Sequence, residues 1–264
     1  MCNLKNKKPF TLHIRHYTFN TLVYGFMVFC LIVGTAFADL TPHMLARVEA
    51  LAVGVRSYKA NYDLILRVDE KELKLKGMVL YKWPRQMRNE MTVEGPLGTQ
   101  QIIYWKEGIV WQYLPSSKVA FRQQEARLRE KFPEDFVSQD LLNLQNPFDL
   151  VETKTIHFIE EQQQEGEAVY LFEGIPKKAI QIQKALAPHL CRFWISTNDG
   201  LLRNFSMYDE NGQEIYRQRF WDIQINLELL DEEFEFRLPE NVEVVEVTQE
   251  TEKRLSGMAK EAPL

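Results

Sequence analysis

The residue types that most often perform catalysis are scarce in this sequence of 264 residues. Outside the first 38 residues, histidine occurs only at His43, His157 and His189. His157 alternates with apolar neighbours in a predicted strand and has no partner constellation, so we interpret it as structural. No nucleophile elbow, zinc-protease helix, P-loop or dinucleotide-binding motif is present in the sequence. We therefore predict that the protein is not an enzyme. A hydrolase acting on lipid or envelope polymer is a weak alternative, because no nucleophile–base pair can be named.

Acidic and sulfur-containing side chains do not suggest a metal centre. Glu160, Glu161 and residues 231–233 lie at predicted turns, where runs of charge are normally solvated. No His, Cys or carboxylate cluster has the spacing of a metal site, so we expect no metal and no cofactor. Cys191 is the one cysteine beyond residue 38, and its apolar surroundings predict a buried, inert thiol without an internal disulfide.

Large apolar side chains, in contrast, recur at alternate positions of neighbouring predicted strands. A curved sheet covered by a few short helices has a concave side, and an enclosed apolar concavity is the default ligand site of such a chain. The alternative is that these side chains simply fill a core. Strand alternation assigns one face to the ligand, with part of a first helix as a lid, although a shift of one residue would move a strand's whole set to the other face. The expected wall is Leu64, Leu66, Met87, Met91, Ile103, Trp105, Trp111, Phe205 and Trp221, and the expected lid is Met44, Leu45 and Val48.

The elements that position these residues are mostly strands with period-two alternation, which begin near residue 58. Hairpins are predicted across Lys106-Glu107-Gly108 and across Asn211-Gly212. About eleven strands in meander order indicate an α+β protein, mainly antiparallel β, whose sheet curls or closes. The expected helices are few, at residues 41–55, 124–131 and about 138–144, and residues 176–187 fit either a helix or a strand.

The N-terminus is typical of a cleaved secretory signal. Four basic residues precede an apolar run at residues 22–33, and Ala36-Phe37-Ala38 supplies small residues at both positions that a signal peptidase reads. We expect a signal peptide at 1–38, one domain at 39–250 and a flexible tail at 251–264. An uncleaved anchor is the alternative, although the apolar run is short for a membrane span. The remaining 226 residues would hold 28 basic and 37 acidic side chains, a net charge of −9, which disfavours nucleic acid as a partner.

Several blocks of sequence together resemble the LolA-type carriers, which are periplasmic outer-membrane lipoprotein carriers. Residues 80–88, LYKWPRQMR, resemble the segment of that family in which a strand ends at a proline, and residues 101–115 resemble its following hairpin. The blocks at 193–195, 199–201, 209–213, 220–226 and 234–242 follow the family's closing order. The resemblance implies a strongly curved, incomplete barrel with helices as a lid over an apolar cavity. It also implies lipoprotein acyl chains or another lipid as cargo, passed from an inner-membrane transporter to an outer-membrane acceptor by a monomeric carrier in the periplasm, without a cofactor.

The chain departs from that family at two places. Trp83 stands where the family has an arginine that bonds the lid shut, and Arg85 or Arg88 are the available substitutes. Residues 238–242 replace the family's final Pro-Pro-Gly-Val. Two functions therefore stay open, a periplasmic carrier of lipoproteins or other lipids, and a periplasmic sensor or regulatory module of the same fold that binds lipid or a partner protein.

Overall fold

Strands dominate the chain in the computed structural model, which describes residues 40–68, 71–95, 98–133, 143–177 and 187–260. Within these residues twelve strands belong to one sheet. The strands are β1 (Ser57–Val68), β2 (Lys71–Lys82), β3 (Gln86–Val93), β4 (Gln100–Lys106), β5 (Ile109–Leu114), β6 (Val119–Gln124), β7 (His157–Gln164), β8 (Glu167–Gly174), β9 (Leu190–Ser196), β10 (Leu202–Tyr208), β11 (Glu214–Ile225) and β12 (Glu243–Glu246). The helices are α2 (Thr41–Ala52), α3 (Glu125–Lys131) and α5 (Thr248–Lys260), with short 3-10 turns η1 (Pro147–Leu150), η2 (Thr153–Thr155) and η3 (Asp231–Phe234).

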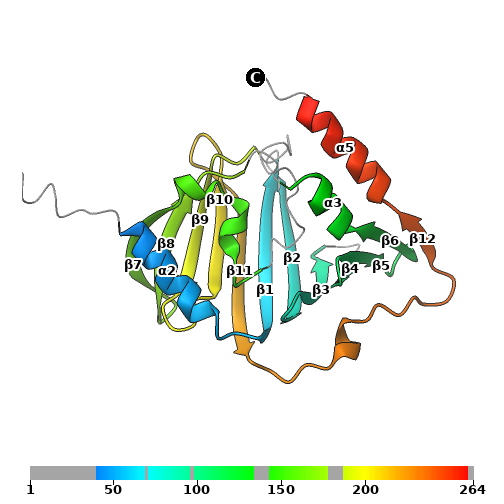
Figure 1. Cartoon of the computed structure of the whole chain (residues 1–264), viewed down its shortest axis with the longest axis horizontal. Coiled ribbons are helices and arrows are strands. Elements are labelled where there is room, and N and C mark those ends of the chain that lie inside the picture. The colour runs from blue at the N-terminus through cyan, green and yellow to red at the C-terminus, as the bar shows by residue number, and fades with distance from the viewer. Residues whose placement is uncertain (1–39, 69–70, 96–97, 134–142, 178–186, 261–264) are drawn as a thin grey trace, which may run out of the picture. The chain divides into compact units, whose positions relative to one another are not determined.

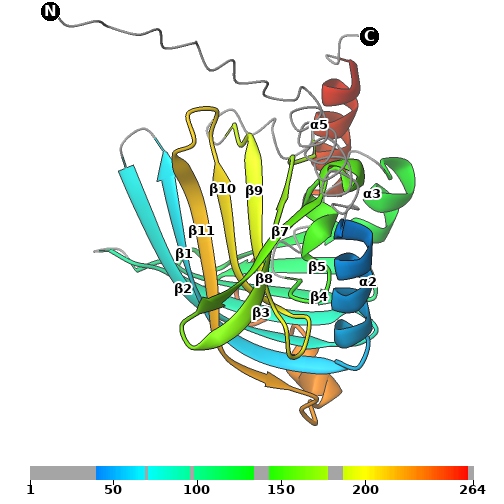
Figure 2. The same ribbon diagram turned by 90° about the vertical axis from the view of Figure 1, so that its left-hand side faces the viewer.

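Two antiparallel meanders build the sheet. Strands β1–β6 form one and β7–β11 form the other, and β1 pairs with both β2 and β11, which joins them (Figure 1). The order β12-β6-β5-β4-β3-β2-β1-β11-β10-β9-β8-β7 leaves β12 and β7 as two edges, so the sheet does not close. Figure 2 shows β3 to β5 running across the view behind the steeply oriented β9 to β11, because the sheet is strongly curved. The predicted class, a mainly antiparallel incomplete barrel with helices, is confirmed, with twelve strands rather than about eleven.

One hairpin turn is shorter than the sequence suggested. Lys106 pairs with Ile109, so the turn contains only Glu107 and Gly108. Both have positive φ, 54° and 75°, which is the conformation of the two-residue turns that match strand twist. The expected three-residue turn is therefore wrong by one residue. As a consequence, Trp105 lies opposite Val110 rather than opposite Ile109.

Helix α2 packs against the second meander. It contacts β7 and the turn between β9 and β10. Gly200 in that turn has φ +72°, and a Cβ atom there would lie 2.5 Å from the carbonyl oxygen of Val48. A glycine is thus required both by the backbone conformation and by the close approach of the helix. Leu144 and Val151, which precede β7, complete the buried layer on this side.

The C-terminal residues form a structure that the sequence did not predict. β12 pairs with β6 in parallel, and α5 then packs on α3. Glu252 of α5 forms ion pairs with Arg127 at 2.7 Å and Lys131 at 2.8 Å. Residues 251–260, expected as part of a flexible tail, thus belong to helix α5, which contacts α3, a helix distant in the sequence.

Some expectations fall on residues outside those described. These are the leader at 1–38, most of the helix expected at 138–144 and most of the ambiguous segment 176–187. Among the described helices, none combines the length and the apolar character that crossing a membrane requires.

Candidate functional site

An apolar row runs out of the core along the concave face of the β1–β2 hairpin. Tyr62 on β1 is buried, but Leu64 and Leu66 further along are only half-buried. Leu64 lies opposite Leu75 and Leu66 lies opposite Leu73, which is 41% exposed. Contiguous apolar side chains at a surface are unusual and normally mark a binding site. We call this surface the open wall and define it as Leu64, Leu66, Leu73, Leu75 and Met91, together with Tyr216, which is buried opposite Leu66.

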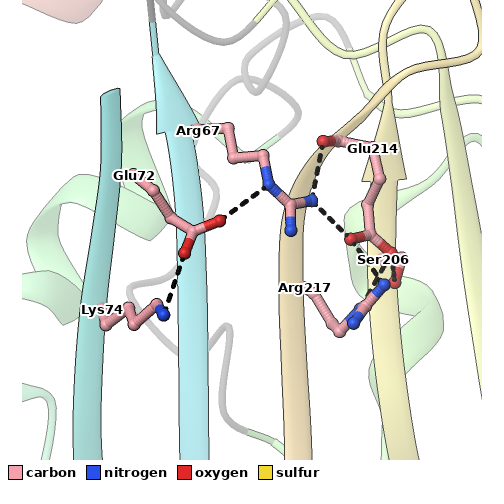
Figure 3. A network of polar contacts seen from close by, with 6 residues as sticks. All are labelled: Arg67, Glu72, Lys74, Ser206, Glu214 and Arg217. Atoms are coloured by element: carbon pink, nitrogen blue, oxygen red, sulfur yellow. Dashed lines mark hydrogen bonds and ion pairs between the residues drawn. The ribbon is translucent and has the colours of Figure 1, made fainter. Parts of the chain in front are cut away.

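The opposite face of the same hairpin is densely charged. Arg67 forms ion pairs with Glu72 at 3.1 Å and with Glu214 of β11 at 2.8 Å (Figure 3). Glu72 also pairs with Lys74, and Glu214 with Arg217. Hydrogen bonds from Lys74 and Arg67 lower the pKa of Glu72. Ion pairs on one face and leucines on the other give the hairpin an unambiguous orientation.

Tyr62 marks the inner end of the open wall. It lies opposite Gly77, and its hydroxyl donates a hydrogen bond to Asn89 Oδ1 on β3 at 2.8 Å. A Cβ atom on Gly77 would lie 2.5 Å from the Tyr62 hydroxyl and 2.5 Å from the carbonyl oxygen of Glu90. The missing side chain at Gly77 is therefore what lets the ring cross β2. Burial raises the pKa of Tyr62, so the hydroxyl stays protonated and can donate.

The structure divides the residues expected to line the cavity into two groups. Leu64, Leu66 and Met91 are half-buried on the open wall. The other concave members, by contrast, are almost completely buried in the core, and these are Met87, Ile103, Trp105 and Phe205. Of the expected lid, Val48 is buried and Met44 and Leu45 are half-buried against the core beside β7. The expected set thus includes part of the open wall together with core residues.

Two expected wall residues lie on the outer face instead. Trp111 pairs with Tyr104, and its ring packs on Phe236 with centroids 5.0 Å apart. Trp221 lies opposite Asn61, while its neighbour Phe220 faces Tyr62 on the concave side. Trp111 and Trp221 were expected on the same face as Trp105 and Phe205 and lie on the opposite one, because the alternation of β5 and β11 is shifted by one residue from the expected one.

Leu73, Leu75 and Tyr216 belong to the open wall but were not selected from the sequence. Leu73 and Leu75 alternate with lysine and glutamate, a pattern that does signal one apolar face. Their position opposite Leu64 and Leu66 needed the hairpin register. Tyr216 gave no such signal, because the neighbouring inward residue on its strand is the polar Gln218.

Helix α3 is attached to the sheet by a buried carboxylate. Trp105 Nε1 donates a hydrogen bond to Glu125 Oε2 at 2.5 Å, and Arg129 pairs with Glu125 Oε1 at 2.6 Å. The Glu125 side chain is only 2% exposed, so both partners are needed to compensate its desolvation. A cleft of about 600 Å³ lies beside this contact, lined by residues that include Arg85, Gln86 and Glu107.

The structure separates the three residues near the family's lid-bonding position. Trp83 is 56% exposed and lies under the Arg56 guanidinium, whose carbon is 5.1 Å from the ring centroid. Arg88 points to the outer face, where it donates to the carbonyl oxygen of Glu233. Arg85 lies near Trp105 and lines the cleft beside α3. Of the two arginines, Arg85 therefore lies beside helix α3, whereas Arg88 contacts the 3-10 turn η3.

Reactive side chains are absent from the open wall. Cys191 is buried and free, as predicted, and burial raises the pKa of its thiol to about 12. His43, His157 and His189 are exposed. Among the residues that the structure describes, no three His, Cys, Asp or Glu side chains lie close enough to hold a metal ion.

Comparison with known proteins shows that the fold of this chain is similar to solved structures. The sequence matches no protein-family model and no curated protein. An uncharacterized conserved protein from Thermus thermophilus has a similar solved structure, with a TM-score of 0.52 and 16% identity over 78% of this chain and 98% of that one. At this identity the likeness concerns the fold alone.

Two further solved structures carry names related to the sequence resemblance. A putative outer membrane lipoprotein-sorting protein domain from Vibrio parahaemolyticus has 13% identity and a TM-score of 0.38, covering 73% of this chain and 94% of that one. A LolA superfamily protein from Nitrosomonas europaea has 14% identity and a TM-score of 0.35, covering 74% and 97%.

Proposed function

We propose that this protein binds the acyl chains of lipoproteins, or of other lipids, on the open wall and carries them between membranes. The single observation that supports the proposal best is the row of half-buried and exposed leucines that continues the core along the β1–β2 hairpin. In a folded chain, such a row is stabilised when an apolar ligand covers it.

The physical chemistry of an acyl chain suits this surface. Each buried CH₂ group contributes about 0.8 kcal/mol, so one chain of ordinary length supplies several kcal/mol. Met91 at the edge of the wall is unbranched and flexible, which allows adaptation to chains of different length. No charged side chain is needed for this kind of binding.

A matched pair of variants on β1 tests the proposal. Leu66 faces the open wall, whereas Ile65, one residue earlier and also half-buried, points to the outer face opposite Lys74 and Arg217. We expect Leu66→Glu to weaken binding of a fluorescently labelled phosphatidylcholine by at least about tenfold, because an unpaired charge resists desolvation. Ile65→Glu should leave the affinity unchanged.

Thermal melting of both variants separates binding from folding. Loss of binding in Leu66→Glu with a cooperative melt supports the open wall as the ligand surface. Equal binding in the two variants would place the lipid elsewhere. A wild-type protein that binds no lipid would refute the function itself.

A sensor or regulatory module of the same fold is the second candidate. The cleft of about 600 Å³ beside α3, with charged Arg85, Glu107 and Glu130 at its margin, offers a surface that a partner protein can recognise. Transfer separates the two candidates, since a carrier loaded with labelled lipid should deliver it to acceptor vesicles. A sensor should retain the lipid and change its affinity for a partner protein.

The proposed location is the periplasm, which follows from the predicted leader and the LolA-type resemblance. In this scheme an inner-membrane transporter loads the protein and an outer-membrane acceptor unloads it. N-terminal sequencing of exported protein should give Asp39 as the first residue. An exported form that begins before Val28 would contradict the cleaved leader.

A further inference from the structure

Two primary amides lie on the concave face where the open wall meets the core. Asn89 on β3 and Gln218 on β11 are both 0% exposed. Each carbonyl oxygen is used, since Asn89 Oδ1 accepts from the Tyr62 hydroxyl at 2.8 Å and Gln218 Oε1 accepts from the Tyr216 hydroxyl at 2.9 Å. Burial raises the pKa of both tyrosines, which therefore stay neutral donors.

The nitrogen of each amide lacks an acceptor. Among the described residues, neither Asn89 Nδ2 nor Gln218 Nε2 has a hydrogen-bond partner in the protein. An unsatisfied buried N–H group is costly, and folded proteins normally pair such groups with protein, water or ligand. Two donor groups therefore remain available at the base of an apolar surface.

The sheet register places both amides beside the open wall. Gln218 lies directly opposite Leu64, and Asn89 precedes Met91 by two residues on the same face of β3. Tyr62 lies between them on β1, with its ring over Gly77. Leu64 beside Gln218 and Met91 beside Asn89 are only half-buried, and Met91 is flexible, so these neighbours can move aside for a ligand.

The chemistry of these donors selects a neutral acceptor attached to an apolar chain. The neighbours that the sheet register gives the two amides on this face are the two protonated tyrosines and apolar side chains, among them Phe205, Leu64 and Ile103. None of these is a cation that could pair with a carboxylate or a phosphate. A plain hydrocarbon, in contrast, has no acceptor at all. A carbonyl oxygen in an ester or amide bond meets both conditions, and it stands at the start of every ester- or amide-linked acyl chain.

We propose that Asn89 and Gln218 donate hydrogen bonds to the carbonyl oxygens of ester- or amide-linked acyl chains bound on the open wall. The proposal rests on the proposed function and narrows its ligand class. Phospholipids and lipoproteins share this acyl carbonyl, whereas ether-linked chains lack it. The amides thereby select for the linkage, while the leucines bind the chain.

Two lipids that differ only in the carbonyl test this proposal. Short-chain diester and diether phosphatidylcholines of equal chain length are compared by their displacement of a fluorescent probe, anilinonaphthalene sulfonate. We expect wild-type protein to bind the diester about tenfold more tightly, which corresponds to one or two added hydrogen bonds. Equal affinities would overturn the proposal and show that the amides bind water only, while the proposed function would stand. Binding of neither lipid would refute the proposed function as well.

Paired substitutions identify the amides responsible. Tyr62→Phe combined with Asn89→Leu removes both hydrogen-bonding partners together, as does Tyr216→Phe with Gln218→Met, so that no buried group is left unpaired. Each double variant should lose part of the ester preference and keep its affinity for the diether. Gln224→Met, which changes an exposed amide on the same strand, should bind like wild type. If both double variants fold and keep the full preference for the diester, the proposal is overturned. If a variant does not fold, the comparison of diester and diether binding by the wild-type protein still tests the proposal.

Discussion

Replacing Gly77 by alanine tests the geometry at the inner end of the open wall. The new Cβ atom would lie 2.5 Å from the Tyr62 hydroxyl and from the Glu90 carbonyl oxygen, well inside ordinary contact distance. The Tyr62 ring must then move, and its hydrogen bond to Asn89 is lost.

The expected loss in the free energy of unfolding is the sum of two effects. Overpacking of a filled core costs about 1–3 kcal/mol. Leaving the Tyr62 hydroxyl and the Asn89 carbonyl unpaired costs about 1–3 kcal/mol more. Denaturant unfolding of Gly77→Ala should therefore report a loss of about 2–6 kcal/mol.

Two further variants make this measurement decisive. Gly54→Ala is the control, since its Cβ would meet nothing closer than 4.0 Å, and it should be nearly neutral. In a Tyr62→Leu background, Gly77→Ala should cost at least about 1 kcal/mol less, because only the backbone contact with Glu90 remains. A cost of Gly77→Ala equal to that of Gly54→Ala, or full additivity with Tyr62→Leu, would refute the tight packing of the ring against β2.

Three other outcomes are expected. Trp105→Phe should lower stability by about 1.5–3 kcal/mol in denaturant unfolding, because the buried Glu125 carboxylate loses a donor; the effect should shrink in a Glu125→Gln background. The pKa of Glu252 is lowered, mainly by the hydrogen bond from Lys131 and further by Arg127, against the effect of burial. The attachment of α5 is thus complete above the ordinary glutamate pKa and weakens as the pH falls through the lowered value, so melting curves of wild type and Glu252→Gln should differ at neutral pH and converge in acid. Cys191→Ser should fold with a loss of about 1–2 kcal/mol in denaturant unfolding, and native Cys191 should resist alkylation at neutral pH.

The strands and their order could be predicted from the sequence because both depend on local patterns. Period-two alternation and short turns predict consecutive antiparallel strands. The structure confirms this prediction for the meanders β1–β6 and β7–β11. The burial of Cys191 likewise followed from its apolar neighbours, and its unpaired state followed from its being the one cysteine beyond residue 38. Leu64, Leu66 and Met91, which alternation assigned to the ligand wall, lie half-buried against the core, and their contact with a ligand stays a prediction.

The sequence did not determine which side chains of a strand point to the concave face, because a difference of one residue in a turn or in the phase of a strand exchanges the two faces. The turn at Glu107 and Gly108 is one residue shorter than expected, and this moved Trp111 to the outer face. On β11 the polar Gln218 is buried on the concave face together with Phe220, and Trp221 therefore lies on the outer face. A period of two leaves no margin, because a shift of one position exchanges the two faces.

Contacts between residues far apart in the sequence determined the C-terminal structure and the boundary between the core and the open wall. The parallel pairing of β12 with β6 and the packing of α5 on α3 join residues more than a hundred positions apart, and no local pattern announces them. The same is true of the boundary between filled core and open wall, since Phe205 and Leu66 are equally apolar in the sequence. The burial of a side chain depends on which other parts of the chain cover it. Those parts are determined by the path of the whole chain rather than by the residue and its sequence neighbours.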